Sequence, residues 1–449
     1  MENDYLIEKK PLLALTLFAL PIIIGNFFQQ IYTMVDSAIV GRYVSETALA
    51  AIGASTSLTN IFICIAIGGG MGASVIVSQY FGSKSYGKMK TAIYTSLIVF
   101  FIVSMLLGGF GLMFSRDIMK VLNTPEDAFD VAVEYLDIYF MGLPFLFMYN
   151  VLSAMFNALG KSRIPLYFLI FSSVFNIVLD WILVTQFDMG VAGVAWATLI
   201  AQGISAVCSF VVLVRELGRI NSARTSVFNT AELLPIARIS FPSILQQSTV
   251  SIGMMLVQSV VNSFGSEALA GFSAAMRIES LCIVPMIGIG NAMSSYTAQN
   301  IGAKKKERVI EGYHASNVMV VICAAVILVM VALLNCQMIA FFLGDNASVV
   351  ATSTGRSYLK FMGFFFCLIG FKMAVDGLLR GAGDMKMFTV ANLVNLGIRV
   401  AIAMIFAPQF GINFVWYAVP AGWLANWIIS YMEYHTGKWK SNTSVQTVS

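Results

Sequence analysis

Charged residues are scarce in this sequence. Aspartate, glutamate, lysine and arginine together make up 11% of its 449 residues, against about 25% in an ordinary soluble domain. Hydrophobic residues make up 58%, which is more apolar surface than a single core can hide from water. The composition therefore excludes an ordinary soluble domain and predicts a protein embedded in a lipid bilayer.

Residue types that carry chemistry are also rare. Histidine occurs only at His314 and His435, and no HExxH or GxSxG motif is present. The 6 cysteines stand singly in apolar stretches, without a CxxC or metal-ligand spacing. No basic run is interleaved with aromatic residues, so nucleic acid is not an expected partner. These absences argue against an enzyme and against a bound cofactor.

Residues 1–10, MENDYLIEKK, mix acids and bases. They lack the basic start and the small-residue cleavage site of a signal peptide. We interpret them as a short cytosolic tail or the start of an interfacial helix.

Long apolar segments recur along the chain. A helix needs about 20 mostly apolar residues to cross the hydrocarbon core of a bilayer. Lys372, Asp376 and Arg399 interrupt two of the segments, the tenth and the eleventh. We expect twelve spans, at residues 14–40, 50–80, 91–114, 134–158, 165–186, 191–214, 238–263, 270–299, 311–342, 356–379, 388–407 and 414–434.

The distribution of basic residues predicts the orientation of these spans. An even number of spans puts both termini on the same side of the membrane. Most of the 27 lysines and arginines then fall on the side of the N-terminus, for example in 84–90 and 304–308. Because basic loops remain in the cytoplasm, we predict a multi-pass protein of the cell membrane with both termini cytoplasmic.

The second half of the chain repeats the first. At a shift of 220 residues, Gly68 and Gly70 correspond to Gly288 and Gly290. Six spans separate the copies, so both halves have the same orientation. The pattern predicts an all-α integral membrane fold, with two six-helix lobes related by pseudo-two-fold symmetry along the membrane normal. The expected parts are an N-terminal lobe (1–220), a cytosolic linker (221–235) and a C-terminal lobe (236–449).

Several segments resemble one family of transporters. They are LPIIIGNFFQQIYTMVDSAIVGR in the first span, GSEALAG after the seventh and LRGAGD after the tenth. Together with the duplicated twelve-span pattern, they are similar to the multidrug and toxic compound extrusion (MATE) family. The resemblance implies a secondary antiporter that exports organic, often cationic, compounds in exchange for Na⁺ or H⁺. We expect such a protein to work as a monomer.

One acid in the first span needs an explanation. A carboxylate at the centre of a bilayer costs roughly 2.5–3.5 kcal/mol, yet Asp36 follows a stretch from Pro11 to Val35 that has no charge. The fifth span contains Asn176 and Asp180, which are four residues apart and share a helix face.

The family resemblance implies a cation site for these residues. Positions matching Asp36, Asn150, Asn176, Asp180 and Thr198 are implicated in cation binding in the family. Their carboxylate, amide and hydroxyl oxygens suit a small cation, with Na⁺ a possible ligand at Asp36, Asn176 and Asp180. A proton needs the same residues, because burial and a second carboxylate both favour the protonated form of an acid. Alternatively, Asn150 and Thr198 bond helix to helix, and Asp180 reaches the membrane interface.

The duplication does not preserve this site in the second half. Further along the chain, Gly160 corresponds to Gly383, a shift of 223 residues. At this shift Asn176 corresponds to Arg399 and Asp180 to Ala403. The seventh span has no acid where many family members have a glutamate. A guanidinium repels a cation, so we expect the cation site in the first lobe alone.

The second lobe has charges of its own within its spans. Lys372, Asp376 and Arg380 recur every four residues on one span, and Arg277 and Glu279 lie on another. Mutual pairing would lower their cost in the membrane. The alternative is that one of them contacts the substrate.

Substrate contacts are expected near the interface of the lobes. Thioethers and other adaptable side chains there could accommodate different shapes. Pro21 and Pro242, in the first span of each half, are expected to kink their helices, either as hinges or for static packing. The candidate cavity residues are Gln29, Tyr32, Met34, Gln246, Gln247, Met254, Asp376 and Arg399.

The main alternative is a flippase or an exporter of a lipid-linked or narrow-specificity metabolite on the same fold. Such a protein would line its cavity with basic residues for phosphate, and the spans of the first lobe contain none. The sequence therefore favours an efflux antiporter.

Overall fold

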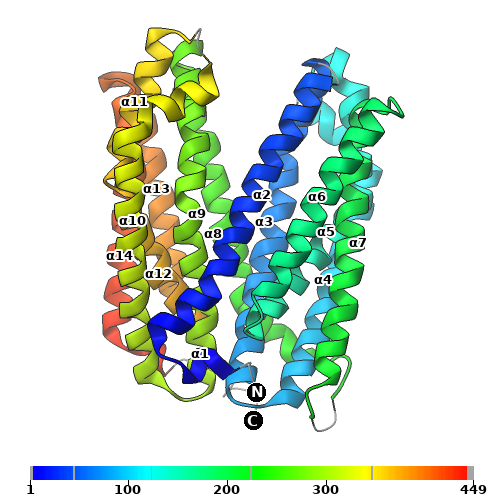
Figure 1. The fold of residues 1–449 in the computed structure, drawn as a ribbon, viewed down its shortest axis with the longest axis vertical. Coiled ribbons are helices and arrows are strands. Elements are labelled where there is room, and N and C mark those ends of the chain that lie inside the picture. The colour runs from blue at the N-terminus through cyan, green and yellow to red at the C-terminus, as the bar shows by residue number, and fades with distance from the viewer. Residues whose placement is uncertain (1–3, 44–45, 123, 223–224, 345–346, 442–449) are drawn as a thin grey trace. The chain divides into compact units, whose positions relative to one another are not determined.

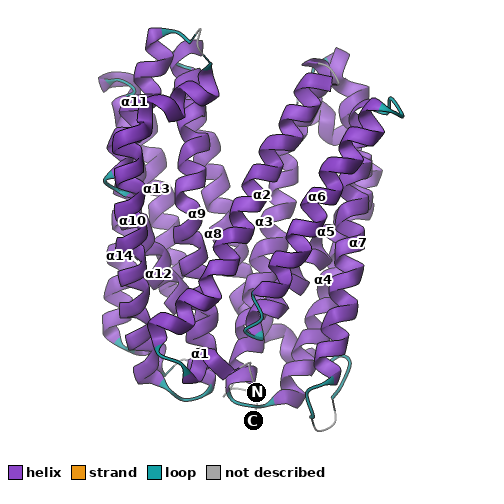
Figure 2. Ribbon diagram, viewed as in Figure 1, coloured by secondary structure: helices purple, strands orange, loops and turns teal. Residues whose placement is uncertain are grey.

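A computed structural model describes residues 4–43, 46–122, 124–222, 225–344 and 347–441. The side chains of residues 36–38, 40–51, 54, 57 and 127 also lie outside the described part. Within the described residues the chain consists of helices and loops, without a strand (Figure 2). The predicted all-α fold is confirmed.

The helices of the two halves are labelled in Figure 1. The first half contains α1 (Tyr5–Glu8), α2 (Pro11–Tyr43), α3 (Glu46–Gly82), α4 (Tyr86–Val121), α5 (Glu126–Ala158), α6 (Arg163–Thr185) and α7 (Gly190–Gly218). The second half contains the 3₁₀ helix η2 (Thr230–Glu232), α8 (Leu233–Asn262), α9 (Ser266–Gly302), α10 (Lys306–Leu343), α11 (Val349–Gly363), α12 (Phe366–Ala382), α13 (Met385–Phe410), α14 (Asn413–Thr436) and η3 (Lys438–Lys440).

The helices account for all twelve predicted spans. Ten described helices are long and apolar enough to cross a membrane, and α11 with α12 forms one further span that is bent by 53°. The twelfth predicted span falls on α14, which has 24 residues but is not among the helices that are apolar enough to cross a membrane. The tenth span, predicted at 356–379, begins at Val349 and is broken after Gly363.

Two repeat-related glycines mark the helix corners. Gly160 follows α5 with a φ of 75°, and Gly383 ends α12 with a φ of 78°. This left-handed conformation is accessible to glycine at little cost. The repeat detected in the sequence is thus also a repeat of backbone geometry.

The described helices form two compact units, and each is a bundle of its own. Unit 1 comprises Met1–Ile23 and Leu245–Ser449, and unit 2 comprises Ile24–Ile244. Two helices, α2 and α8, are therefore shared between the units. In both, the boundary falls two residues after a proline, Pro21 or Pro242.

These units differ from the expected lobes in where they place the first halves of α2 and α8. The start of α2 belongs with the second half of the chain, and the start of α8 belongs with the first half. The lobe boundaries at 1–220 and 236–449 placed each of these helices wholly in one lobe. That division, like the hinge role of the two prolines, stays a prediction.

Glycines allow the first halves of α2 and α8 to pack closely in the units that receive them. In unit 2, a Cβ added to Gly68 of α3 would lie 2.6 Å from the Cα of Ile244 in α8. In unit 1, a Cβ added to Gly288 of α9 would lie 2.4 Å from the side chain of Ile23 in α2. Real side chains do not approach this closely, so both positions require glycine. The repeat that matches Gly68 with Gly288 therefore reproduces the same contact in each unit.

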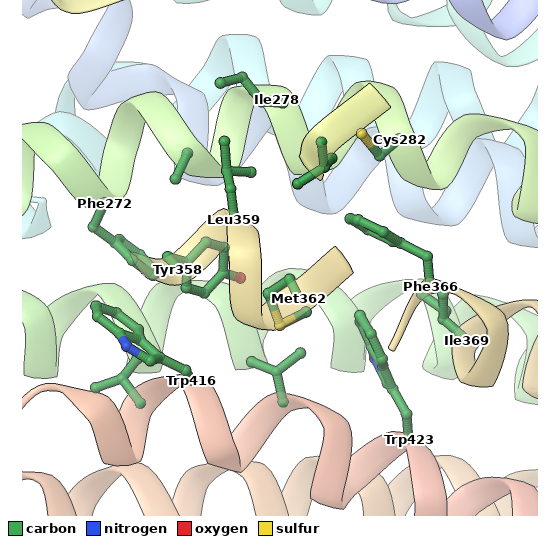
Figure 3. Close-up of a cluster of buried hydrophobic side chains, with 14 of the residues drawn as sticks. Phe272, Ile278, Cys282, Tyr358, Leu359, Met362, Phe366, Ile369, Trp416 and Trp423 are labelled. Atoms are coloured by element: carbon green, nitrogen blue, oxygen red, sulfur yellow. The ribbon is translucent and has the colours of Figure 1, made fainter. Parts of the chain in front are cut away.

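One helix is central in each bundle. In unit 2, α5 packs against α3, α4 and α7. In unit 1, α9 packs against α10, α11 and α12, and an apolar cluster fills the space between α9, α11 and α14 (Figure 3). Within it, Phe272 stacks on Trp416 and Tyr358 meets Trp416 edge-on at 5.1 Å between ring centroids.

Short segments before α2 and α8 are tied to the bundle that receives the following half-helix. In unit 1, Asn300 Nδ2 donates a hydrogen bond to the carbonyl of Leu6 in α1 over 3.1 Å. In unit 2, the backbone N–H of Asn229, shortly before α8, donates to Thr95 Oγ1 of α4 over 3.1 Å. Both half-helices are therefore fixed at their N-terminal ends.

Candidate functional site

Three of the five predicted cation-site residues meet in unit 2. Asn176 and Asp180 lie one turn apart on α6, and Thr198 lies on α7, which packs against α6. With the Asn176 amide oriented to satisfy both of its ends, its nitrogen donates to Asp180 Oδ2 over 2.9 Å and its oxygen accepts from Thr198 Oγ1 over 3.3 Å. A carboxylate, an amide and a hydroxyl thus form one hydrogen-bonded group, which we call the α6–α7 site.

The α6–α7 site is shielded from the surface of its bundle. Asp180 is 0% exposed and Asn176 is 2% exposed. This burial differs from the alternative in which Asp180 reaches the membrane interface. Because an ionised carboxylate is costly in an apolar environment unless it is hydrogen-bonded or paired, the amide of Asn176 lowers the cost of keeping Asp180 there.

The donor set suits a hard monovalent cation or a proton. No group of three histidine, cysteine, aspartate or glutamate side chains gathers as a metal site within the described residues. The α6–α7 site instead offers carboxylate, amide and hydroxyl oxygens, which are the ligand types that Na⁺ shares with other hard cations. The same carboxylate can take up a proton.

Of the other two predicted members, Asn150 is not brought into this group, and the side chain of Asp36 lies outside the described residues. Asn150 lies on α5 and donates its side-chain hydrogen bond to the carbonyl of Leu146 on the same helix, over 2.8 Å. Its bond is therefore local and does not reach Asn176, Asp180 or Thr198. The backbone of Asp36 lies in α2, but its side chain lies outside the described residues, so its place in the site stays a prediction.

Unit 1 contains a second polar group, which we call the α12–α14 ring. Lys372 Nζ lies 2.9 Å from Asp376 Oδ2 and donates to Asn392 Oδ1 over 3.2 Å. Asn426 Nδ2 donates to the same oxygen of Asn392 over 3.1 Å. Ser430 Oγ donates to Asp376 Oδ1 over 2.8 Å and lies 3.3 Å from Asn426 Oδ1, which closes the ring. The Lys372 and Asp376 side chains are each 2% exposed.

A guanidinium extends this ring by one helical turn. Arg380, also on α12, interacts electrostatically with Asp376. Its nitrogens donate to Asn291 Oδ1 over 3.0 Å, to Ser294 Oγ over 3.2 Å and to Gln246 Oε1 over 3.4 Å. The pairing predicted for the stripe of Lys372, Asp376 and Arg380 is thus present.

Two other charged residues within the helices of unit 1 form a separate group. Glu279 of α9 accepts a hydrogen bond from the hydroxyl of Tyr358 in α11 and interacts electrostatically with Arg399 of α13. Arg277, which the sequence places beside Glu279, is exposed. Arg399, which corresponds to Asn176 in the repeat, therefore interacts with a buried acid of its own bundle.

The predicted cavity residues divide between the units. Gln29 is exposed, and Tyr32 and Met34 are half-buried, all on the part of α2 in unit 2. The remaining candidates belong to unit 1: Gln246, Gln247, Met254, Asp376 and Arg399. Two of these are enclosed within unit 1, since Asp376 is 1% exposed and the Nε of Arg399 is buried.

Sequence reasoning missed three members of the α12–α14 ring. Asn392, Asn426 and Ser430 stand alone in apolar helices, where single polar residues are common. The i, i+4 spacing of Asn426 and Ser430, which places them on one face of α14, was the available signal.

Comparisons with known proteins agree with this architecture. The MatE family model matches residues 21–182 and 242–405, one copy in each half. The chain is 30% identical over 429 residues to the probable multidrug resistance protein YpnP of Bacillus subtilis, covering 95% of both chains. It is 26% identical over 442 residues to the probable multidrug resistance protein YoeA of the same organism, covering 95% of this chain and 94% of the relative.

A solved structure has the same fold. The chain aligns with a MOP superfamily transporter from Pyrococcus furiosus with a TM-score of 0.91 and 23% sequence identity, covering 99% of both chains.

Proposed function

This chain belongs to the MATE family of multi-pass membrane transporters, and on that premise we propose that it is a secondary antiporter that exports organic, often cationic, compounds in exchange for inward Na⁺ or H⁺. Relatives named as multidrug resistance proteins support the substrate class. We further propose that it acts in the cell membrane, as a monomer, with both termini in the cytoplasm.

The observation that carries the proposal is the burial of Asp180 within the α6–α7 site. A fully buried carboxylate, held by an amide and next to a hydroxyl, has the donors needed to bind an ion in an apolar bundle. Asp36 would add a second carboxylate from α2. Exchange of this ion across the membrane would drive substrate export by alternating access of the two lobes.

The driving force is sufficient for drug export. One charge that crosses about 100 mV releases about 2.3 kcal/mol, and each tenfold ion gradient adds about 1.4 kcal/mol. Together they support an outward substrate gradient of a few hundredfold, by the equivalence of about 1.4 kcal/mol to a factor of ten.

The flippase alternative finds less support. A phosphate group requires accessible cations, whereas Lys372 and Arg380 of unit 1 are 2% and 5% exposed and bonded within their own bundle. Arg399 interacts with Glu279 in the same way.

Ethidium efflux from a pump-deficient bacterial host tests the proposal. Cells that express the wild type, Asp180→Asn or Asp36→Asn are assayed with and without external Na⁺ at fixed pH. Export by the wild type and its loss in both variants is the expected result, and dependence on Na⁺ identifies the ion. Normal expression is checked by immunoblotting.

Two matched controls sharpen the experiment. Asp188 is an exposed acid just beyond α6 with a φ of 53°, a conformation that asparagine adopts readily, so Asp188→Asn should export normally. Arg399→Gln should also leave coupling intact if the ion site belongs to the first lobe alone. Undiminished export by Asp180→Asn, or loss only in Arg399→Gln, would contradict the proposal.

A further inference from the structure

Basic side chains gather at one end of unit 1. Residues 8–10, where α1 ends and α2 is about to begin, and residues 304–308, where α9 is joined to α10, include six basic residues and two acids. Within the described part of the chain, none of these basic residues forms an ion pair with a carboxylate. The next acids, Asp4 and Glu311, lie about one helical turn further along. We call this group the basic corner, and it consists of Lys9, Lys10, Lys304, Lys305, Lys306 and Arg308.

Hydrogen bonds hold the two segments of the basic corner against each other. Lys305 Nζ donates to the carbonyl of Ile7 over 3.2 Å, and Arg308 Nη2 donates to the carbonyl of Lys9 over 2.6 Å. The corner therefore lies where α1 meets the turn between α9 and α10 (Figure 1). Its exposed side chains, which are available to a partner outside the protein, include Lys9, Lys10 and Lys304.

An exposed apolar surface begins next to the basic corner. The first half of α2 follows Lys10 directly, and its Thr16 Oγ1 lies 3.8 Å from Met319 Sδ of α10. One side of this half-helix is buried in unit 1, as Phe18 shows with 0% exposure. Large apolar side chains elsewhere on it, and on α10 around Met319, are exposed: Leu12, Leu13, Leu20, Val318 and Ile322. Cations thus stand at the end of an apolar surface that two helices share.

This combination matches the two parts of an anionic phospholipid. Lysines close to a membrane surface attract anionic headgroups, and the exposed apolar side chains are suited to an acyl chain because contact between apolar surfaces is favourable. A soluble phosphate would use the cations alone. The lipid therefore accounts for both halves of the surface.

The corresponding corner of unit 2 lacks part of this arrangement. Lys84 is the repeat counterpart of Lys304 and has the same left-handed backbone, with a φ of 58° against 60°. Residues 225–232, which precede α8, contain no basic residue, and their one acid, Glu232, is buried and accepts a hydrogen bond from Tyr80. No equivalent of Lys9 and Lys10 therefore stands before α8. Unit 2 supplies a control for a site in unit 1.

We propose that an anionic phospholipid binds to unit 1 beside α1, α2 and α10, with its headgroup at Lys9, Lys10 and Lys304 and an acyl chain along the exposed surface of α2. Because the headgroup contacts both the segment before α2 and the turn between α9 and α10, the lipid fastens the start of α2 to unit 1. The inference goes beyond the proposed antiport and depends only on the embedding of the chain in a bilayer.

Quenching of a tryptophan by brominated lipids tests this site. Leu20 is 52% exposed and lies about 15 Å along the helix from Lys10, about half the thickness of the hydrocarbon core. The Leu20→Trp protein is reconstituted in phosphatidylcholine vesicles that contain an equal mole fraction of either brominated phosphatidylglycerol or brominated phosphatidylcholine. The signal of the 6 natural tryptophans, measured without the substitution, is subtracted.

The added tryptophan should report a preference for phosphatidylglycerol of about fivefold, as expected for a lysine beside an anionic headgroup. The bromines are on the acyl chains, so a soluble phosphate bound at the lysines would give no signal. Leu106→Trp on α4 of unit 2, where the leucine is 68% exposed, reports on lipid away from the site and should show no preference.

Charge variants of the Leu20→Trp protein locate the headgroup. Replacing all three exposed lysines of the corner, by Lys9→Gln, Lys10→Gln and Lys304→Gln together, should abolish the preference. Lysine-to-arginine changes at the same three positions keep the charge and should keep the preference.

The matched control removes the same charge from unit 2. Lys84→Gln, Lys88→Gln and Arg238→Gln together replace three exposed cations there and should leave the preference unchanged. A preference that is lost equally in this control overturns the site, because it would reflect the total charge of the protein.

A second measurement covers the case in which tryptophan does not fit at Leu20. The melting temperature of the protein with its natural Leu20 should rise more with phosphatidylglycerol than with phosphatidylcholine, and the three lysine-to-glutamine changes should remove this difference.

The outcomes separate this inference from the proposed function. Equal quenching by the two brominated lipids in Leu20→Trp, or a preference that survives loss of the three lysines, overturns the lipid site. Ethidium efflux is measured independently, so this result leaves the proposed antiport standing. Absence of efflux together with an intact lipid preference contradicts the antiport alone.

Discussion

Asn176 donates a hydrogen bond to Asp180 from one turn away on the same helix, with 2.9 Å between the amide nitrogen and Oδ2. Its amide oxygen accepts from the hydroxyl of Thr198. The hydroxyl thereby fixes the amide in the orientation that supports the carboxylate. This dependence makes Thr198 a positioning residue for the α6–α7 site.

Thr198→Val should weaken ion coupling without abolishing it. Valine keeps the shape but removes the donor to Asn176, and a hydrogen bond contributes about 1 kcal/mol. We expect the ion concentration for half-maximal ethidium efflux to rise by a factor of about five. Thr198→Ser, which retains the hydroxyl, is the matched control and should behave as the wild type. Equal behaviour of Val and Ser variants would exclude the positioning role.

Asp376→Asn should strongly destabilise unit 1. It leaves Lys372 without the carboxylate that pairs with it in a buried environment, and removal of one partner of a buried ion pair costs about 3–5 kcal/mol. Thermal unfolding in detergent would show this as a lower melting temperature. In the double variant Lys372→Met with Asp376→Leu the ion pair is removed as a whole, so the loss should be smaller than in Asp376→Asn, while Arg380 still loses its interaction with Asp376. If Asp376→Asn is as stable as the wild type, the buried pair of Lys372 and Asp376 does not stabilise the protein.

Gly72→Ala should disturb the packing of α8 on α3. A Cβ at this position would lie 2.3 Å from the backbone of Ser240, and overpacking of this kind costs about 1–3 kcal/mol. Gly109→Ala is the matched control, because a Cβ there meets nothing within 4 Å. The melting temperature in detergent should fall for Gly72→Ala alone. Equal melting temperatures would show that the start of α8 is free to move away.

The turn between α12 and α13 should make stability depend on pH. Burial, followed by the negative charge of Glu433, raises the pKa of Asp384 from 3.8 to about 6. The folded protein thus holds this proton more tightly than the unfolded chain. Its contribution to stability is complete at pH values below 3.8 and is lost as the pH rises through about 6.

Asp384→Asn removes this titration. Its melting temperature should vary less between pH 5 and 7 than that of the wild type, and at pH 7 it should be the more stable protein. Glu267→Gln is the control, because it removes one negative charge from an exposed side chain instead of a buried one. A wild-type melting temperature that rises between pH 5 and 7 would show the sign to be wrong.

The architecture follows from the sequence because its signals are strong and local. Apolar length identifies the spans, and repeated glycines such as Gly68 and Gly288 identify the duplication. The exchange of half-helices was not predictable in the same way. Nothing in the composition of α2 or α8 shows that its two halves pack in different bundles, since apolar residues run through both halves of each helix.

The α6–α7 site was partly predictable for a similar reason. Asn176 and Asp180 share a helix face by spacing alone, whereas Thr198 came from the family resemblance. The closed ring around Lys372 depends on three helices meeting at one depth. Spacing along α12 predicts the pair with Asp376, but the partners from α13 and α14 follow only from the tertiary packing.

The first 23 residues leave the ribosome long before the helices that receive them. They pack in unit 1, whose other helices begin to be synthesised only after residue 244. Unit 2, in turn, still lacks Ser240 and Ile244 when its last complete helix, α7, has been made. During membrane insertion the start of α2 therefore waits for the bundle that receives it, whereas unit 2 waits for the start of α8. A chain truncated in the linker would leave Gly68 and Gly72 of α3 without their covering helix.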